Sequence, residues 1–240
     1  MSNEMRVVPV QSRAGTAAGV GQAGLSDAAG KVLRNTYALL SLTLLFSAAM
    51  AGASMALNAP YGLSLVCSLV ALGLLWFVLP RVGHSMAGIY VVFAVTGLLG
   101  FGLGPVLNMY LRGFANGGQL IMMAFGMTGA VFIGLSMYAV RSRRDFSFMG
   151  GFLASGIMIA FVLSIGLLVA SMLGYHLQPL ALAVSAMFSL LMCGLILYQT
   201  GEIVNGGETS YVLATVTLYV SIYNLFTSLL HLLGFASSDD

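Results

Sequence analysis

Five polar residues recur at intervals of 4, 3, 4 and 3 residues in the last apolar stretch of the chain. They are Thr217, Ser221, Asn224, Ser228 and His231. A repeat of about 3.5 residues places all five on one face of an α-helix. Polar groups that face hydrocarbon are unfavourable, so this face should be turned toward other helices. We call these five residues the polar seam.

The polar seam allows two kinds of chemistry. One is hydrogen bonding between helices, which contributes about 0.6 kcal/mol per contact. The other is a polar path for an ion or a proton through the protein. Serine and asparagine are not ionised, so the seam residues Ser221 and Asn224 cannot hold a charge. The residue types alone leave both interpretations open.

Residue patterns that would support catalysis or metal binding are absent from the sequence. Lys31, the only lysine, precedes the apolar runs, so no membrane lysine can form a Schiff base. Paired membrane aspartates and an HExxH motif are both missing, and no G-x-S-x-G motif surrounds Ser228, which lies three residues before His231. The histidines match no metal-ligand spacing, and Cys67 and Cys193 are expected to be small buried apolar residues. We therefore expect no enzyme, no cofactor and no metal site.

The composition requires that lipid covers most of the protein surface. Hydrophobic residues make up 59% of the 240 residues and charged residues only 7%, whereas soluble domains carry about 25% charged residues. Seven apolar runs approach the roughly 20 residues that a membrane helix needs. Their approximate limits are 37–57, 61–79, 86–107, 119–140, 149–173, 178–199 and 211–235. None alternates as a barrel strand would, so we predict an all-α integral membrane protein with seven transmembrane helices.

The distribution of basic residues predicts how the chain crosses the membrane. One side would collect eight of them, whereas the other side would carry Arg112 alone. Because basic loops stay in the cytoplasm, the N-terminus is expected there and the C-terminus outside. The eight residues are Arg6, Arg13, Lys31, Arg34, Arg81, Arg141, Arg143 and Arg144.

This topology divides the chain into three parts. We expect residues 1–35 to form a disordered cytoplasmic tail, because they are polar and contain no apolar run. Residues 36–236 should form the membrane domain, and 237–240 a short periplasmic tail. The protein would be a multi-pass protein of the bacterial inner membrane, with the lipid bilayer as its first partner and no nucleic acid partner.

Charged residues at the predicted cytoplasmic face form a candidate interaction surface. It contains Arg141, Arg143 and Arg144 in one loop and Glu202 and Glu208 in another. The arginines could anchor the topology or bind anionic lipid or a partner. Glu208 would also stabilise the N-terminus of the last helix, where a negative charge is favourable.

A glycine-rich stretch in the third apolar run predicts close packing between helices. Gly97, Gly100 and Gly104 are spaced by three and four residues and so share one helix face. A neighbouring backbone can approach such a face closely. Pro105 should bend or end this helix near the outer surface.

Five stretches of the chain, over about residues 30 to 236, resemble the Bax inhibitor-1 (transmembrane BAX inhibitor motif) family. Their order and spacing both fit. They are "KVLRNTYALLSLTL", "TGLLGFGLGPVLN", "RRDFSFMGGFL", "LYQTGEI" and "GGETSYVLATVTLYVSIYNLFTSLLHLLGF". The resemblance is greatest to the bacterial YccA-like branch, whose members modulate the membrane-bound AAA protease FtsH.

The resemblance implies a seven-helix bundle with the last helix at its centre, and it implies two candidate functions. The first is binding and inhibition of an FtsH-type protease within the membrane. The second is a pH-sensitive calcium or cation leak, which in the wider family depends on two membrane aspartates. The matching positions here are Gln199 and Ser221, so both carboxylates are missing. Because Ca²⁺ favours carboxylate ligands, the substitutions favour the protease modulator.

Overall fold

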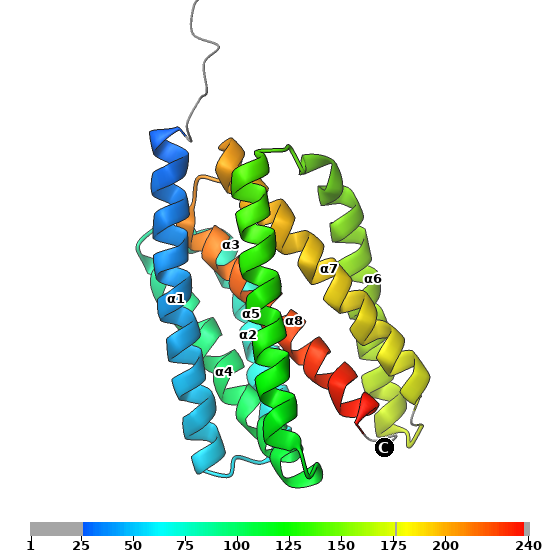
Figure 1. Ribbon diagram of the computed structural model, residues 1–240. Helices are drawn as coiled ribbons and strands as arrows, with labels where there is room; N and C mark the ends of the chain where they lie inside the picture. The colour runs from blue at the N-terminus through cyan, green and yellow to red at the C-terminus, as the bar shows by residue number, and fades with distance from the viewer. Residues whose placement is uncertain (1–25, 176, 238–240) are drawn as a thin grey trace, which may run out of the picture.

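The computed structural model describes residues 26–175 and 177–237, and all of its regular elements are helical (Figure 1). Seven helices of the described part are long and apolar enough to cross a membrane. One of these spans, 61–82, runs through two α-helices and the π-helix η1 between them. The elements are α1 (Asp27–Ala56), α2 (Tyr61–Gly73), η1 (Leu74–Val78), α3 (Leu79–Val82), α4 (Ala87–Gly113), α5 (Gly117–Ser142), η2 (Ser147–Met149), α6 (Gly150–Met172), α7 (Gln178–Asn205) and α8 (Tyr211–Ala236).

The seven apolar runs all become helices, which confirms the predicted fold class, but several helices extend beyond their runs. Helix α1 begins at Asp27, so residues 27–35 are helical. The prediction of a disordered tail over residues 1–35 is therefore wrong for residues 27–35. The Ser26 side chain accepts a hydrogen bond from the Ala29 amide at 3.2 Å and caps this helix. Residues 1–25 lie outside the described residues.

Two further helix ends differ from expectation. Helix α4 passes through Pro105 and ends only at Gly113, so the proline does not end it. Helix α7 ends at Asn205, because Gly206 adopts the left-handed conformation, with φ +79°, that often follows a helix. Glu202 therefore belongs to the last turn of α7 and not to a loop.

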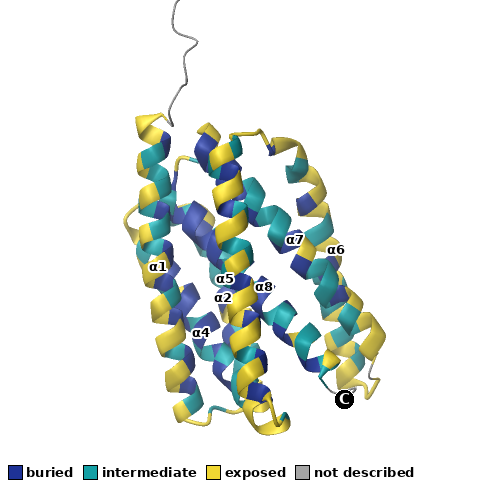
Figure 2. Ribbon diagram, viewed as in Figure 1, coloured by how far each residue is buried: buried dark blue, intermediate teal, exposed yellow. Residues whose placement is uncertain are grey.

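Two helices, α4 and α8, form the centre of the bundle. Half of the most apolar segment of each is buried, against 11% for the span that contains α6. Figure 1 shows α8 crossing behind α5, and it packs against α1, α4, α5 and α7. Figure 2 shows buried residues along these central helices and exposed residues on the outer faces. The expected central position of the last helix is confirmed.

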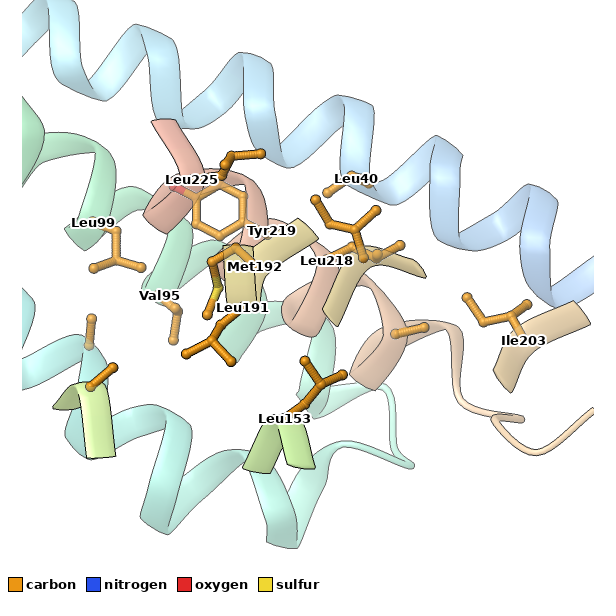
Figure 3. Close-up of a cluster of buried hydrophobic side chains, with 14 residues drawn as sticks. Leu40, Val95, Leu99, Leu153, Leu191, Met192, Ile203, Leu218, Tyr219 and Leu225 are labelled. Carbon is orange, nitrogen blue, oxygen red and sulfur yellow. The ribbon is translucent and has the colours of Figure 1, made fainter. Parts of the chain in front are cut away.

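The largest cluster of buried apolar side chains is built around α8. Leu218, Tyr219 and Leu225 of α8 lie among residues from α1, α4, α6 and α7, as Figure 3 shows. Leu40 of α1 and Leu191 of α7 are members of the same cluster. The central helix is thus held by apolar contacts on several sides at once.

The predicted glycine face packs α4 against α1. A Cβ atom on Gly100 would lie 2.4 Å from the Ser47 carbonyl oxygen, and one on Gly104 would lie 2.5 Å from the Ser54 side chain. A Cβ on Gly97 would lie 2.9 Å from the ring of Phe46. These separations are too short for any side chain, so the glycines are what allow the two backbones to approach. The packing interpretation of this stretch is confirmed.

Candidate functional site

The polar seam runs the length of α8, but its members do not share one environment. Ser221 and Ser228 are buried, Thr217 and Asn224 are half-buried, and His231 is exposed. The apolar face opposite is buried as well, since Leu218 and Leu225 are both 1% exposed or less. Helix α8 is enclosed on both faces along its middle, so burial does not set the seam apart.

The hydrogen bonds in the middle of the seam remain within α8. The Ser221 hydroxyl donates to the Thr217 carbonyl at 2.7 Å, and the Asn224 amide donates to the Val220 carbonyl at 2.8 Å. Serine and asparagine can bond to the preceding turn in this way and need no second helix. Between helices, the only described hydrogen bond of the seam joins His231 Nδ1 to Ser185 Oγ of α7 at 2.7 Å.

Buried hydrogen bonds between helices come from a residue outside the seam. The Tyr219 hydroxyl donates to the Thr96 carbonyl of α4 at 3.2 Å and lies 2.5 Å from Ser47 Oγ of α1. Because the phenol has one hydrogen, the Ser47 hydroxyl is the donor in the second bond. Tyr219 thereby joins α8 to two other helices inside the core.

Sequence reasoning did not single out Tyr219 or its companion Thr215. The Thr215 hydroxyl donates to the Thr36 carbonyl of α1 at 3.3 Å and to the Tyr211 carbonyl at 2.6 Å. The available signal was chemical, because a tyrosine hydroxyl in hydrocarbon must find a hydrogen-bond partner. Thr215 and Tyr219 are four residues apart, so they form a second polar face, directed at α1.

Tyr219→Phe is expected to lower the free energy of unfolding by about 1–2 kcal/mol, because it removes two buried hydrogen bonds and leaves the Ser47 hydroxyl unpaired. Titration of the purified protein with sodium dodecyl sulfate, followed by circular dichroism, measures the change. Tyr90→Phe is the control, since it makes the same chemical change in α4 at a side chain that is 79% exposed. Equal unfolding midpoints for the two variants would contradict a stabilising role for Tyr219.

The two positions that the resemblance pairs with the family's aspartates lie in the neighbouring helices α7 and α8. Gln199 of α7 is 7% exposed and Ser221 of α8 is fully buried. No hydrogen bond joins them among the described residues, since the Ser221 hydroxyl is bonded to Thr217. In the same part of the chain no group of three or more His, Cys, Asp or Glu side chains could hold a metal ion. Neither Gln199 nor Ser221 has an ionisable side chain.

Charged residues gather where the α5–α6 and α7–α8 connections lie. Arg141 and Arg144 are exposed, and the Asn205 amide donates to the Arg144 carbonyl at 3.2 Å, which joins the α5–α6 connection to the end of α7. A Glu208 carboxylate oxygen accepts from the Ser210 amide at 2.7 Å, at the start of α8 as predicted. The candidate interaction residues of both connections therefore share one end of the bundle.

Asp145 stabilises the turn that leads into the short η2 helix, whose N-cap residue Phe146 makes no side-chain cap hydrogen bond. Its carboxylate accepts a hydrogen bond from the Ser147 amide at 2.8 Å. Hydrogen bonds from Ser147 hold the pKa of Asp145 below its usual value. The carboxylate therefore stays charged at neutral pH, beside the arginines of the same connection.

Comparison with known proteins gives one consistent assignment. Residues 29–238 match the family described as inhibitor of apoptosis-promoting Bax1. The modulator of FtsH protease YccA of Escherichia coli is 48% identical over 87% of this chain and 92% of its own. An uncharacterised protein of Pseudomonas aeruginosa is 46% identical over 87% of this chain and 91% of its own.

A more distant relative comes from an animal. Protein lifeguard 4 of Mus musculus is 32% identical over 85% of this chain and 83% of its own. The family match extends over the seven spans and includes both Gln199 and Ser221. The chain is a member of the Bax inhibitor-1 family.

Proposed function

We propose that this protein binds and modulates, by inhibition, a membrane-bound AAA protease of the FtsH type in the bacterial inner membrane. The observation that carries the proposal is the 48% identity with the modulator of FtsH protease YccA, which extends over 87% of the chain. A second relative with the same identity bears the name inner membrane protein YccA. The seven spans agree with a protein that lies in that membrane.

The geometry of the bundle favours this function over a pH-gated calcium leak. Conduction of Ca²⁺ would need oxygen ligands with negative charge, and the oxygens of Gln199 and Ser221 are neutral. The Ser221 hydroxyl and the Asn224 amide group both donate to carbonyls of their own helix. The polar seam then stabilises α8, and the protein acts on its partner through contacts.

We infer that the N-terminus lies in the cytoplasm and the C-terminus in the periplasm. In the described part of the chain, one end of the bundle carries five exposed or half-exposed cations besides Arg143, whereas Arg112 lies at the opposite end. Basic residues remain on the cytoplasmic side. The five are Lys31, Arg34, Arg81, Arg141 and Arg144.

The charged end would then meet the cytoplasmic part of the protease. Arg141, Arg143, Arg144, Glu202 and Glu208 are the candidate contact residues, because they are charged and share this end of the bundle. The N-terminal tail starts from the same end, since α1 begins there. We propose that the tail takes part in the encounter with the protease.

Co-purification tests the partner. The full chain, extracted in mild detergent, should recover the FtsH-type protease, and its overproduction should lengthen the half-life of a membrane substrate. Replacing Arg141 and Arg144 with serine should reduce recovery several-fold. Arg112→Ser, at the opposite end, is the control and should leave recovery unchanged. The proposal fails if the protease never co-purifies and deletion of the gene leaves substrate turnover unaltered.

A further inference from the structure

A cavity of about 390 Å³ lies between α2, α4, α6, α7 and α8. Most of its lining is apolar, with Leu99 of α4 and Met192 of α7 among the walls. This volume lies within the range of about 300–1,000 Å³ that small-molecule sites occupy. Such sites combine apolar walls with a few polar groups that orient the ligand. The cavity shows the same combination.

Three polar groups from two helices line this cavity without being fully paired. Ser68 Oγ of α2 and Tyr223 Oη of α8 have no hydrogen-bond partner among the described residues. The Asn224 amide group donates to the Val220 carbonyl, which leaves its oxygen free to accept. Five other serines in the helices around the cavity donate to a carbonyl of the preceding turn, as Ser164 of α6 does at 2.9 Å. Unpaired polar groups are costly in a membrane, so a ligand that pairs them would be stabilised.

The walls of the cavity open toward the lipid. The spans that contain α2 and α6 are the least buried of the seven, at 17% and 11% of their most apolar segments. Helix α6 packs chiefly on α7, and the rings of Trp76 and Phe161 meet across the gap with centroids 6.1 Å apart. Trp76 belongs to the π-helix η1, a distortion that is frequent at functional sites.

We propose that this cavity binds an uncharged lipid whose apolar chain ends in a single hydroxyl group. The polar groups lie near the middle of α8, so a charged phospholipid headgroup would have to enter the hydrocarbon at a high cost. A neutral hydroxyl can accept from Tyr223 and donate to the Asn224 oxygen at the same time. The chain would fill the apolar part of the cavity. This inference is independent of the protease partner.

The single tryptophan of the protein provides the assay, because Trp76 lines the cavity. The full chain is reconstituted in phosphatidylcholine vesicles, and a long-chain fatty alcohol with bromine on its chain is added as a quencher. Quenching of Trp76 fluorescence should saturate at a low mole fraction of the alcohol. An alcohol without bromine should restore the fluorescence by competition.

Variants locate the binding. Ala154→Phe fills the cavity from α6 and should abolish saturable quenching, whereas Val162→Phe, on the lipid face of α6, should not. Tyr223→Phe or Asn224→Leu should weaken binding about tenfold each, because each removes a hydrogen-bonding group at nearly constant volume. A far-ultraviolet dichroism spectrum of each variant confirms that it is folded.

Three outcomes would overturn the proposal. Quenching that rises linearly with mole fraction, without competition and equally in Ala154→Phe, would mean that Trp76 only touches bulk lipid. If brominated phosphatidylcholine quenched Trp76 saturably at the same mole fraction as the alcohol, the polar groups of the cavity would not distinguish a hydroxyl from a phospholipid headgroup. Loss of quenching in Val162→Phe but not in Ala154→Phe would place the binding outside the cavity.

Discussion

Replacing Gly100 with leucine is expected to separate α1 from α4 and to lower the free energy of unfolding by about 3 kcal/mol or more. The obstacle is backbone: the Cβ of the new side chain would lie 2.4 Å from the carbonyl oxygen and 2.8 Å from the Cα of Ser47. A flexible side chain could move away, but the backbone of α1 can move only as a helix. Even Gly100→Ala should cost about 1–3 kcal/mol for the same reason.

The control for Gly100→Leu is the same change on a lipid-facing surface. A Cβ on Gly134 of α5 would meet nothing within 4 Å, so Gly134→Leu should leave stability unchanged or improve it slightly through helix propensity. Both variants are compared by dodecyl sulfate titration in the same micelles. If Gly134→Leu destabilises as much as Gly100→Leu, helix packing is not the cause.

Gly100 and Tyr219 are expected to be coupled through Ser47. The close approach at Gly100 holds Ser47 against α4, and the Ser47 hydroxyl lies 2.5 Å from Tyr219 Oη of α8. Moving α1 away would therefore break the hydrogen bond that Tyr219→Phe also removes. The double variant Gly100→Leu with Tyr219→Phe should lose less stability than the sum of the two single variants.

The seven spans were predictable because hydropathy records which residues face lipid, whereas helix ends depend on local caps. Helix α1 starts at Asp27 in a polar segment because Ser26 caps it, and α7 continues to Asn205 because Gly206 is the first residue that leaves the helix. An apolar run marks the part of a helix that lies in the bilayer and not the whole helix. The spacing of the glycines, which depends only on helix geometry, correctly predicted that another helix approaches α4 closely, but not that this helix is α1.

The partners of the polar groups could not be predicted from one sequence. Tyr219 bonds to residues 172 and 123 positions earlier in the chain, and tyrosine counts as apolar in a hydropathy pattern. The polar seam was visible, but whether Ser221 bonds to its own helix or to another depends on its rotamer. The cavity is assembled from five helices, so no local pattern indicates it.

Ser221→Asp is expected to be the most damaging single change at the candidate sensor positions. Ser221 is fully buried, and its hydroxyl donates to the Thr217 carbonyl, whose oxygen would repel a carboxylate. An unpaired charge at the centre of a membrane helix costs about 2.5–3.5 kcal/mol. Dodecyl sulfate titration should therefore show a large shift toward unfolding at neutral pH, which diminishes in acid as the carboxylate is protonated.

Ser221→Ala is the matched control and separates burial of a charge from loss of a hydrogen bond. The Thr217 carbonyl keeps its bond from the backbone of α8, so we expect a loss of only about 0.5 kcal/mol. Similar midpoints for Ser221→Asp and Ser221→Ala at neutral pH would show that the site already accommodates a negative charge.

The same two positions decide whether the chain can conduct calcium. Vesicles loaded with a calcium dye should show no pH-dependent influx with the natural chain, because Gln199 and Ser221 cannot change their charge with pH. The variant with aspartate at both positions tests the complementary case, since it introduces the two carboxylates that the family resemblance implies for a calcium leak. Influx in that variant alone would show that the scaffold can still conduct and that the missing acids prevent the natural chain from doing so. The natural chain could instead show a flux that Gln199→Ala or Ser221→Ala abolishes. The buried amide and hydroxyl would then form a conducting site, and modulation of the protease would be at most one of two functions of the protein.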